Sequence, residues 1–180
     1  MTFNKHIHHR QSIRLRAYDY TQGGMYFITI CTLNKFLLFG HVMDGNMVLN
    51  DIGTIVEDEW KKINILRSNI TLDAFVVMPN HVHGIMVVNE PVGAHCMRPN
   101  ESNHEPSGRV QRAPTIGDIV RGYKSSVTKQ IQQLKNDRET PVWQRNYYER
   151  IIRNENELAG IREYIASNPM QWELDEMYVL

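Results

Sequence analysis

Cysteine and long apolar runs are both scarce in this chain. Only Cys31 and Cys96 occur among 180 residues, and they lie far apart in the sequence. Two such thiols do not make the disulfide framework of a small secreted protein and favour a reducing compartment. No apolar run approaches the roughly 20 residues of a membrane helix, and residues 1–6 lack the apolar core of a secretory signal. We therefore expect a cytoplasmic protein without a membrane partner.

Net charge is also lacking, because 20 Lys and Arg balance 20 Asp and Glu, but the charges are unevenly distributed. Residues 1–18 carry four basic side chains and no acidic one, and residues 98–153 carry eleven basic and six acidic ones. Two separate basic zones can frame a phosphate backbone while the total stays neutral. A solvated surface is the simpler explanation for either zone taken singly. The candidate DNA-contacting side chains in these zones are Arg10, Arg14, Arg16, Arg121, Lys124 and Arg145.

Hydrophobic periodicity predicts strands alternating with helices. Strands are expected at 25–32, at 141–152 and as a pair within 70–88, with a short hairpin turning at 44–46. Helices are expected from about 51 to 66, from 115 to 134 and from 154 to 168. This order predicts one α+β domain over residues 1–180, a ferredoxin-like antiparallel sheet with helices packed on one face. Residues 1–20 would form a basic N-terminal arm, and residues 89–114, broken by several prolines and glycines, a long flexible loop.

A histidine pair stands in the second strand of the 70–88 segment. Side chains two residues apart on a strand point to the same face, so His81 and His83 would project together and could hold one metal ion. Val82 would face the core, and Gly84 would let another backbone or a ligand come close. Taken alone, the pair is as well explained by an ordinary strand with two polar residues on its solvated face.

The last predicted helix carries Tyr164 and Asn168, four residues apart and so on one face. If this helix packs near the histidine strand, Asn168 could supply an oxygen as third metal ligand and Tyr164 would point at the same ion. Imidazole with oxygen donors is compatible with Mg²⁺ or Mn²⁺, although histidine leans toward softer ions. Such an ion would act as a Lewis acid on a phosphodiester. It would also make a phenol, with its ordinary pKa of roughly 10, a useful nucleophile.

Five segments carry a resemblance that spans nearly the whole chain. They are RLRAYDY at 14–20, YFITICT at 26–32, MPNHVHG at 78–84, WQR at 143–145 and YIASNP at 164–169. The histidine–hydrophobic–histidine motif resembles that of HUH endonucleases, and the layout resembles insertion-sequence tyrosine transposases, most of all their REP-associated branch. Relatives usually have glutamine at the last ligand position, and asparagine fits that branch.

The resemblance implies a metal-dependent single-stranded DNA endonuclease and strand transferase. His81, His83 and Asn168 would be the metal ligands and Tyr164 the nucleophile. Members of the family cut single-stranded DNA near hairpins and leave a 5′-phosphotyrosine and a free 3′-hydroxyl. Some relatives are homodimers that exchange their tyrosines, and the sequence leaves open whether this chain is one.

Three alternatives stay open at this point. The protein could be a domesticated relative that binds structured single-stranded DNA without turnover. It could be a zinc protein that uses His81 and His83 with Cys96 or His104. Finally, Tyr147 and Tyr148 are rival nucleophiles, because they stand beside Arg145, Glu149 and Arg150 and alternation puts one of them outward.

Overall fold

The computed structural model describes residues 23–89 and 115–178. Arg10, Arg14, Arg16 and the predicted arm lie outside this part, as do Cys96, His104 and the predicted loop beyond Asn89. The elements, in chain order, are β1 (Gly24–Cys31), a 3-10 turn (Leu33–Lys35), β2 (Gly40–Met43), β3 (Asn46–Leu49), α1 (Asp51–Leu66), β4 (Ile70–Met78), β5 (His81–Val88), α2 (Ile116–Lys135), β6 (Tyr148–Ile152), α3 (Glu155–Ser167) and a 3-10 segment (Asn168–Leu174).

Four strands form one antiparallel sheet in the order β4-β5-β1-β6. With the β1-α1-β4-β5-α2-β6 connections, this is the ferredoxin-like arrangement predicted from the sequence. The predicted hairpin forms a small second sheet of β2 and β3, which turns through Asp44 and Gly45 at positive φ. The α+β fold class is therefore confirmed.

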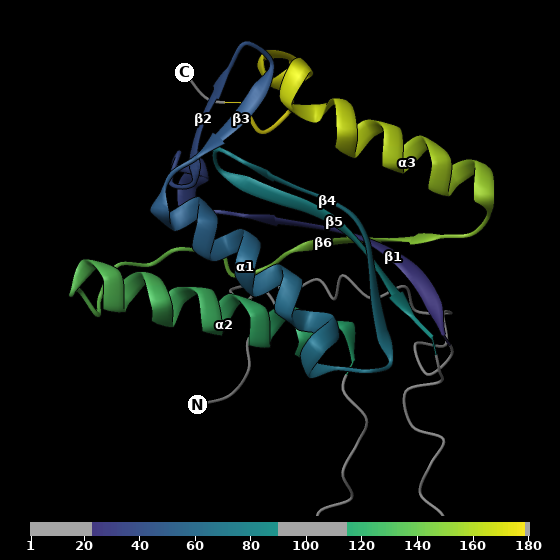
Figure 1. The fold of residues 1–180 in the computed structure, drawn as a ribbon, viewed down its shortest axis with the longest axis horizontal. Coiled ribbons are helices and arrows are strands. Elements are labelled where there is room, and N and C mark those ends of the chain that lie inside the picture. The colour runs from purple at the N-terminus through teal and green to yellow at the C-terminus, as the bar shows by residue number, and fades with distance from the viewer. Residues whose placement is uncertain (1–22, 90–114, 179–180) are drawn as a thin grey trace, which may run out of the picture.

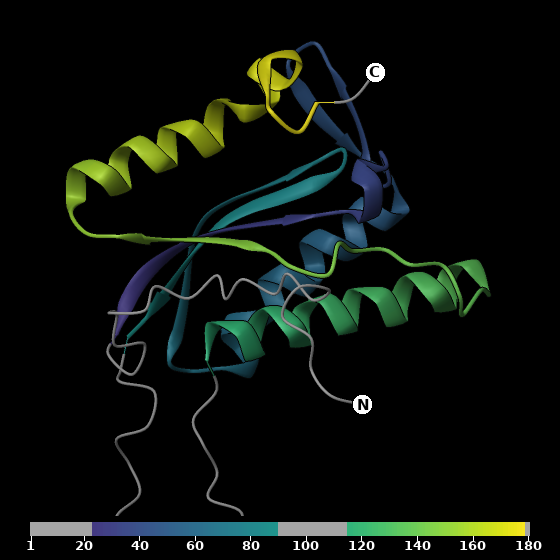
Figure 2. The same cartoon turned by 180° about the vertical axis from the view of Figure 1, so that it is seen from behind.

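The helices cover both faces of this sheet, as Figures 1 and 2 show. Trp60 of α1 and Tyr123 of α2 pack in one core with Val82 and other residues of the sheet, whereas Ile161 of α3 packs with Ile85 in a second core. The expectation that all helices lie on one face is thus wrong for α3. The reason is that β5 is apolar on both sides, since Val82 and Ile85 point in opposite directions, and an apolar strand needs cover on both faces.

The helix starts follow the predicted caps. Asn50 accepts from the amide of Gly53, Asn154 accepts from the amide of Glu157, and Thr115 forms a capping box with Asp118. Among the described residues, no helix combines the length and the apolar character needed to cross a bilayer.

The last strand is shorter than predicted, because β6 begins at Tyr148 and not near Pro141. The preceding segment touches the sheet through a single bridge between Thr32 and Trp143. Lys124 of α2 donates to the carbonyls of Gln144, Arg145 and Asn146. Lys124 therefore holds this segment against α2, and the strand begins beyond it.

Gly84 makes room for Trp60. A Cβ built at Gly84 would lie 2.2 Å from Cζ2 of the Trp60 ring, which stacks on Phe75 at 4.7 Å between centroids. The close approach expected at Gly84 is therefore that of an indole from α1. This contact seats β5 on α1 directly beside His83.

Candidate active site

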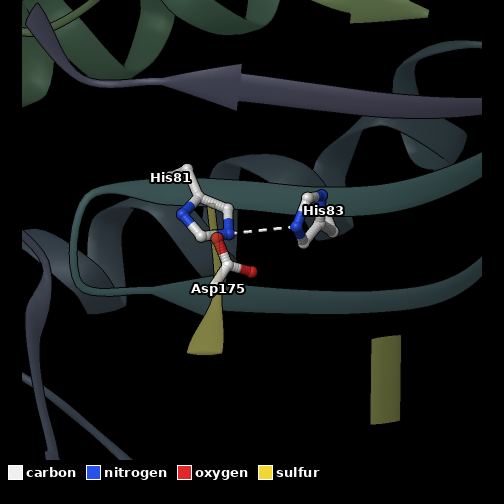
Figure 3. Close-up of side chains that lie close together, drawn as sticks. All are labelled: His81, His83 and Asp175. Atoms are coloured by element: carbon white, nitrogen blue, oxygen red, sulfur yellow. Dashed lines mark hydrogen bonds between the residues drawn. The ribbon is translucent and has the colours of Figure 1, made fainter. Parts of the chain in front are cut away.

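The histidine pair lies side by side on β5, on the face that α3 covers. His81 is fully buried and His83 is 4% exposed, and their Nε2 atoms are 3.0 Å apart. Figure 3 shows the two imidazoles turned toward each other, with the carboxylate of Asp175 beside them. The alternation predicted from the sequence thus places both rings together, but in a buried setting and not on a solvated face.

Each histidine is held through its other ring nitrogen. Nδ1 of His81 lies 2.8 Å from Oδ1 of Asn80, and the Asn80 amide nitrogen donates to the carbonyls of Lys35 and Met177. Because both amide protons are used, Oδ1 is an acceptor, so His81 carries its proton on Nδ1 and presents a lone pair at Nε2. Nδ1 of His83 lies 2.8 Å from the hydroxyl of Thr29, which can serve either tautomer. Such contacts orient metal-ligating imidazoles in proteins.

Burial keeps both rings neutral. It lowers the pKa of His81 to about 4, although the charge of Asp175 opposes the shift. It lowers the pKa of His83 to about 3, and neighbouring His81 adds to the shift. Neutral imidazole is the form that binds a metal, so both rings are ready as ligands at neutral pH.

Helix α3 brings Tyr164 to the same place. Its hydroxyl oxygen lies 3.2 Å from Nε2 of His83 and donates to Oδ2 of Asp175 at 3.3 Å. The ring meets Phe27 edge-on, with 6.1 Å between centroids. Burial, followed by the negative charge of Asp175, raises the pKa of Tyr164 to about 12. The phenol is therefore held in its protonated, weakly nucleophilic form unless a cation lies beside it.

Asn168 continues the helical path one turn after Tyr164. Its dihedral angles are still helical (φ −56°, ψ −42°), and it is only 2% exposed. The amide nitrogen donates to Oδ2 of Asp175 at 2.9 Å, whereas the amide oxygen is buried without a hydrogen-bond partner among the described residues. A buried acceptor left unpaired costs about 1–3 kcal/mol. Coordination of a cation would offset that cost.

Asp175 is the residue that sequence reasoning missed. The 3-10 segment turns the chain back after α3, and the Asp175 carboxylate accepts from the amide of Met177 at 2.6 Å. Its ligand oxygen and the ring nitrogens of His81 and His83 all lie within 4.8 Å of one another. Burial pushes the pKa of Asp175 upward, but the hydrogen bonds from Met177 and Asn168 outweigh it and keep the carboxylate ionised. The acidic C-terminal tail was the only signal, and nothing in its pattern indicates where it lies.

These donors fit a divalent cation. Two imidazole nitrogens and a carboxylate oxygen lie within 4.8 Å of one another. The amide nitrogen of Asn168 contacts the same carboxylate, and its amide oxygen is buried and unpaired among the described residues. In octahedral geometry, ligands at about 2.1 Å from one ion and at right angles to each other are about 3.0 Å apart, which matches the Nε2 separation. This mixed set of nitrogen and oxygen donors is compatible with a divalent metal ion.

A cavity of about 580 Å³ opens beside the histidines. Phe27, His83, Tyr164 and Asp175 line it together with Tyr148, which is 59% exposed. Of the two rival tyrosines, Tyr147 packs against the core and donates to Glu149, whereas Tyr148 faces the cavity. Tyr148 is therefore the rival that shares the site with Tyr164.

The predicted DNA-contacting residues of the second basic zone come together elsewhere. Arg121, Lys124 and Arg145 line a groove of about 520 Å³ between α2 and the segment before β6. Lys124 donates hydrogen bonds to backbone carbonyls and so stabilises the wall of the groove. Burial lowers the pKa of its ammonium group. Arg121 and Arg145 are exposed.

Comparison with known proteins identifies two relatives in sequence. No protein-family model matches the chain. A Haemophilus influenzae protein described as uncharacterized is 45% identical over 177 residues, which cover 98% of this chain and 97% of that protein. The chain belongs to the same family as that protein. A second Haemophilus influenzae protein, named as a candidate REP-associated tyrosine transposase, is 24% identical over 157 residues, or 85% of this chain and 74% of that protein.

Among solved structures, the fold matches that of a REP-associated tyrosine transposase bound to a REP hairpin. The TM-score is 0.52 at 19% identity, over 91% of this chain and 76% of that one. The resemblance to REP-associated tyrosine transposases that the sequence motifs carry is therefore confirmed in sequence and in fold.

Proposed function

We propose that this protein is a metal-dependent single-stranded DNA endonuclease and strand transferase that acts near hairpins through a 5′-phosphotyrosine on Tyr164. The observation that carries the proposal is the Tyr164 hydroxyl lying 3.2 Å from His83 and 3.3 Å from Asp175, at a cluster of metal-type ligands. The related fold of a transposase bound to a REP hairpin supports hairpin DNA as the partner.

His81, His83, Asn168 and Asp175 would hold the ion, either Mg²⁺ or Mn²⁺. When bound, the ion supplies Lewis-acid stabilisation of a phosphodiester and a positive charge beside the phenol. Thr29 and Asn80 orient the two imidazoles, and Asp175 also accepts hydrogen bonds from Tyr164 and Asn168. The Asp175 carboxylate therefore links Tyr164, the proposed nucleophile, to the proposed metal ligands through hydrogen bonds.

The reaction balances with Tyr164 as the only covalent group of the protein. Its hydroxyl oxygen forms a bond to phosphorus while the phosphorus–O3′ bond breaks. The phenolic proton passes along the hydrogen bond to Asp175, and the departing 3′-oxygen takes up one proton and ends as a hydroxyl. Attack by a second 3′-hydroxyl on the phosphotyrosine reverses the step and joins two strands without another energy source.

The same proposal covers the rest of the chain. The full 180 residues would form one catalytic unit, with Arg10, Arg14, Arg16, Arg121 and Arg145 supplying contacts to phosphates. Because Tyr164 reaches the histidines within one chain, a single protomer would suffice for cleavage. A reduced, buried Cys31 and a DNA substrate are in keeping with a cytoplasmic location.

The test uses hairpin oligonucleotides labelled on the strand 3′ of the cut, flanked by varied single-stranded sequences. We expect a denaturation-resistant DNA adduct that requires Mn²⁺ or Mg²⁺, disappears in Tyr164→Phe and persists in Tyr148→Phe. Hairpin binding should be nearly unchanged in both variants. An adduct lost only in Tyr148→Phe would transfer the nucleophile to Tyr148. Hairpin binding with no adduct under any condition would identify a binding protein without turnover.

A further inference from the structure

The part of the cavity beside the histidines that Tyr148 lines has no role in the proposed chemistry at Tyr164. In the sheet register, His83 pairs with Thr29 and Thr29 pairs with Tyr148, so the three side chains form one row across β5, β1 and β6. Directly paired residues of antiparallel strands carry their side chains on the same face. Tyr148 thus lies two strands, about 10 Å, from His83, on the same floor.

The surroundings of Tyr148 suit a flat ring, because aromatic and aliphatic residues line the cavity beside it, with Arg150, Asp175 and Glu176 also in the lining. Phe27 is part of the floor, and Gly160 and Ile161 of α3 form the opposite wall. A Cβ built at Gly160 meets no heavy atom within 4 Å, so the wall is open at that point. Tyr148 remains 59% exposed, although its neighbours on β6 toward Ile152 become buried. Since β6 ends the sheet, the cavity is also reached from the sheet edge.

We infer that this cavity binds one nucleobase of the strand that is cut, stacked on the ring of Tyr148. The inference rests on the proposed function and assigns to Tyr148 a positioning role that needs its ring and not its hydroxyl. Every base has a π-face, so a stacked aromatic tolerates many sequences, and Arg150, at the rim and paired with Glu157, adds a cation beside the backbone. A seated base would fix the neighbouring phosphodiester next to Tyr164.

The experiment measures binding without divalent metal, so that no cleavage occurs. The probe is a fluorescent hairpin oligonucleotide with a randomised single-stranded flank, in which each flank position is replaced in turn by an abasic residue. Loss of one stacked base corresponds to about 5-fold to 150-fold weaker binding. We expect one abasic position to weaken binding to the wild-type protein in this range. Tyr148→Leu should bind the intact probe equally weakly, and the abasic substitution at that position should not weaken its binding further. Tyr148→Phe should behave as wild type.

A second variant guards against loss of folding. Gly160→Met places a long side chain on the same helix face as Tyr164, and methionine is the better helix former. It should leave the thermal midpoint unchanged or higher and still remove the abasic effect. The pocket is overturned if Tyr148→Leu binds as tightly as wild type, if no flank position matters, or if Tyr148→Phe loses the base effect. If one abasic position weakens binding but no Tyr164 adduct forms when metal is present, the proposed function is overturned and the base-binding cavity is supported.

Discussion

The hydroxyl of Tyr164 and Nε2 of His83 are 3.2 Å apart, although 81 positions separate them in the sequence. They meet because Ile85, two residues after His83 and on the same face of β5, packs with Ile161 of α3. The apolar seam that holds the helix therefore also sets the distance between the phenol and the imidazoles.

Asp175 should control the acidity of Tyr164. Asp175→Asn removes the negative charge next to the phenol, so the pKa of Tyr164 should fall from about 12 toward its ordinary value of about 10 while burial keeps part of the shift. The measurement is phenolate absorbance during alkaline titration, taken as the difference between each protein and its Tyr164→Phe derivative. Glu173→Gln, a charge change on the exposed side of the same segment, is the control. An unchanged difference titration in Asp175→Asn would contradict the assignment.

The contrast between Asn168 and Asp175 marks what the sequence could predict. The spacing of Tyr164 and Asn168 fixes a shared helix face, and the spacing of His81 and His83 fixes a shared strand face, because both follow from local backbone periods. Whether two such faces meet depends on which side of the sheet a helix covers, and local pattern does not encode that side. Asp175 lies beyond a 3-10 turn, so no period links it to the ligands.

Stability should fall as the pH falls from about 6.5 toward 4. Burial lowers the pKa of His81 to about 4 and that of His83 to about 3 in the folded protein, whereas both are near 6.5 in the unfolded chain. Between these values the unfolded chain binds more protons, so the free energy of unfolding is fully present above pH 6.5 and is lost as the pH decreases.

Urea unfolding midpoints between pH 7.5 and 4.5 test this dependence. The slope should be smaller in a His83→Gln variant, which keeps a polar side chain at the position. It should be unchanged in His41→Gln, because His41 is exposed on β2. Equal slopes in wild type and His83→Gln would show that another group titrates.

Alanine substitutions at two glycines with different surroundings should change stability in opposite directions. Gly84→Ala forces its Cβ into the Trp60 ring, 2.2 Å away, and should cost about 1–3 kcal/mol in the free energy of unfolding. Gly160→Ala meets open space in α3 and should stabilise by up to about 1 kcal/mol. Chemical denaturation of both variants measures the difference. A Gly84→Ala protein as stable as wild type would mean that the indole moves aside at little cost.

Two substitutions in the groove between α2 and the segment before β6 should affect hairpin binding and stability separately. Arg121 is exposed and its ion pair with Asp118 contributes little to stability, so Arg121→Gln should mainly weaken hairpin binding and reduce the salt dependence by about one unit of slope. Lys124→Gln removes the ammonium that binds the carbonyls before β6 and should mainly lower stability. Anisotropy titrations at several salt concentrations and urea unfolding distinguish the two effects. Unchanged stability in Lys124→Gln would contradict the stabilising role of Lys124.

One protomer should be sufficient for cleavage. Since Tyr164 reaches His83 within a chain, Tyr164→Phe and His83→Ala variants should each be inactive and should stay inactive when mixed. In a dimer that exchanges α3, a mixed pair would combine an intact tyrosine with intact histidines and regain up to about half of the sites. Adduct formation in the mixture, measured after incubation long enough for subunit exchange and compared with the same total of wild type, tells the two arrangements apart. Recovery of adduct would mean that the contact between Tyr164 and His83 is made across two chains during the reaction, with α3 displaced from the position it has in the single chain.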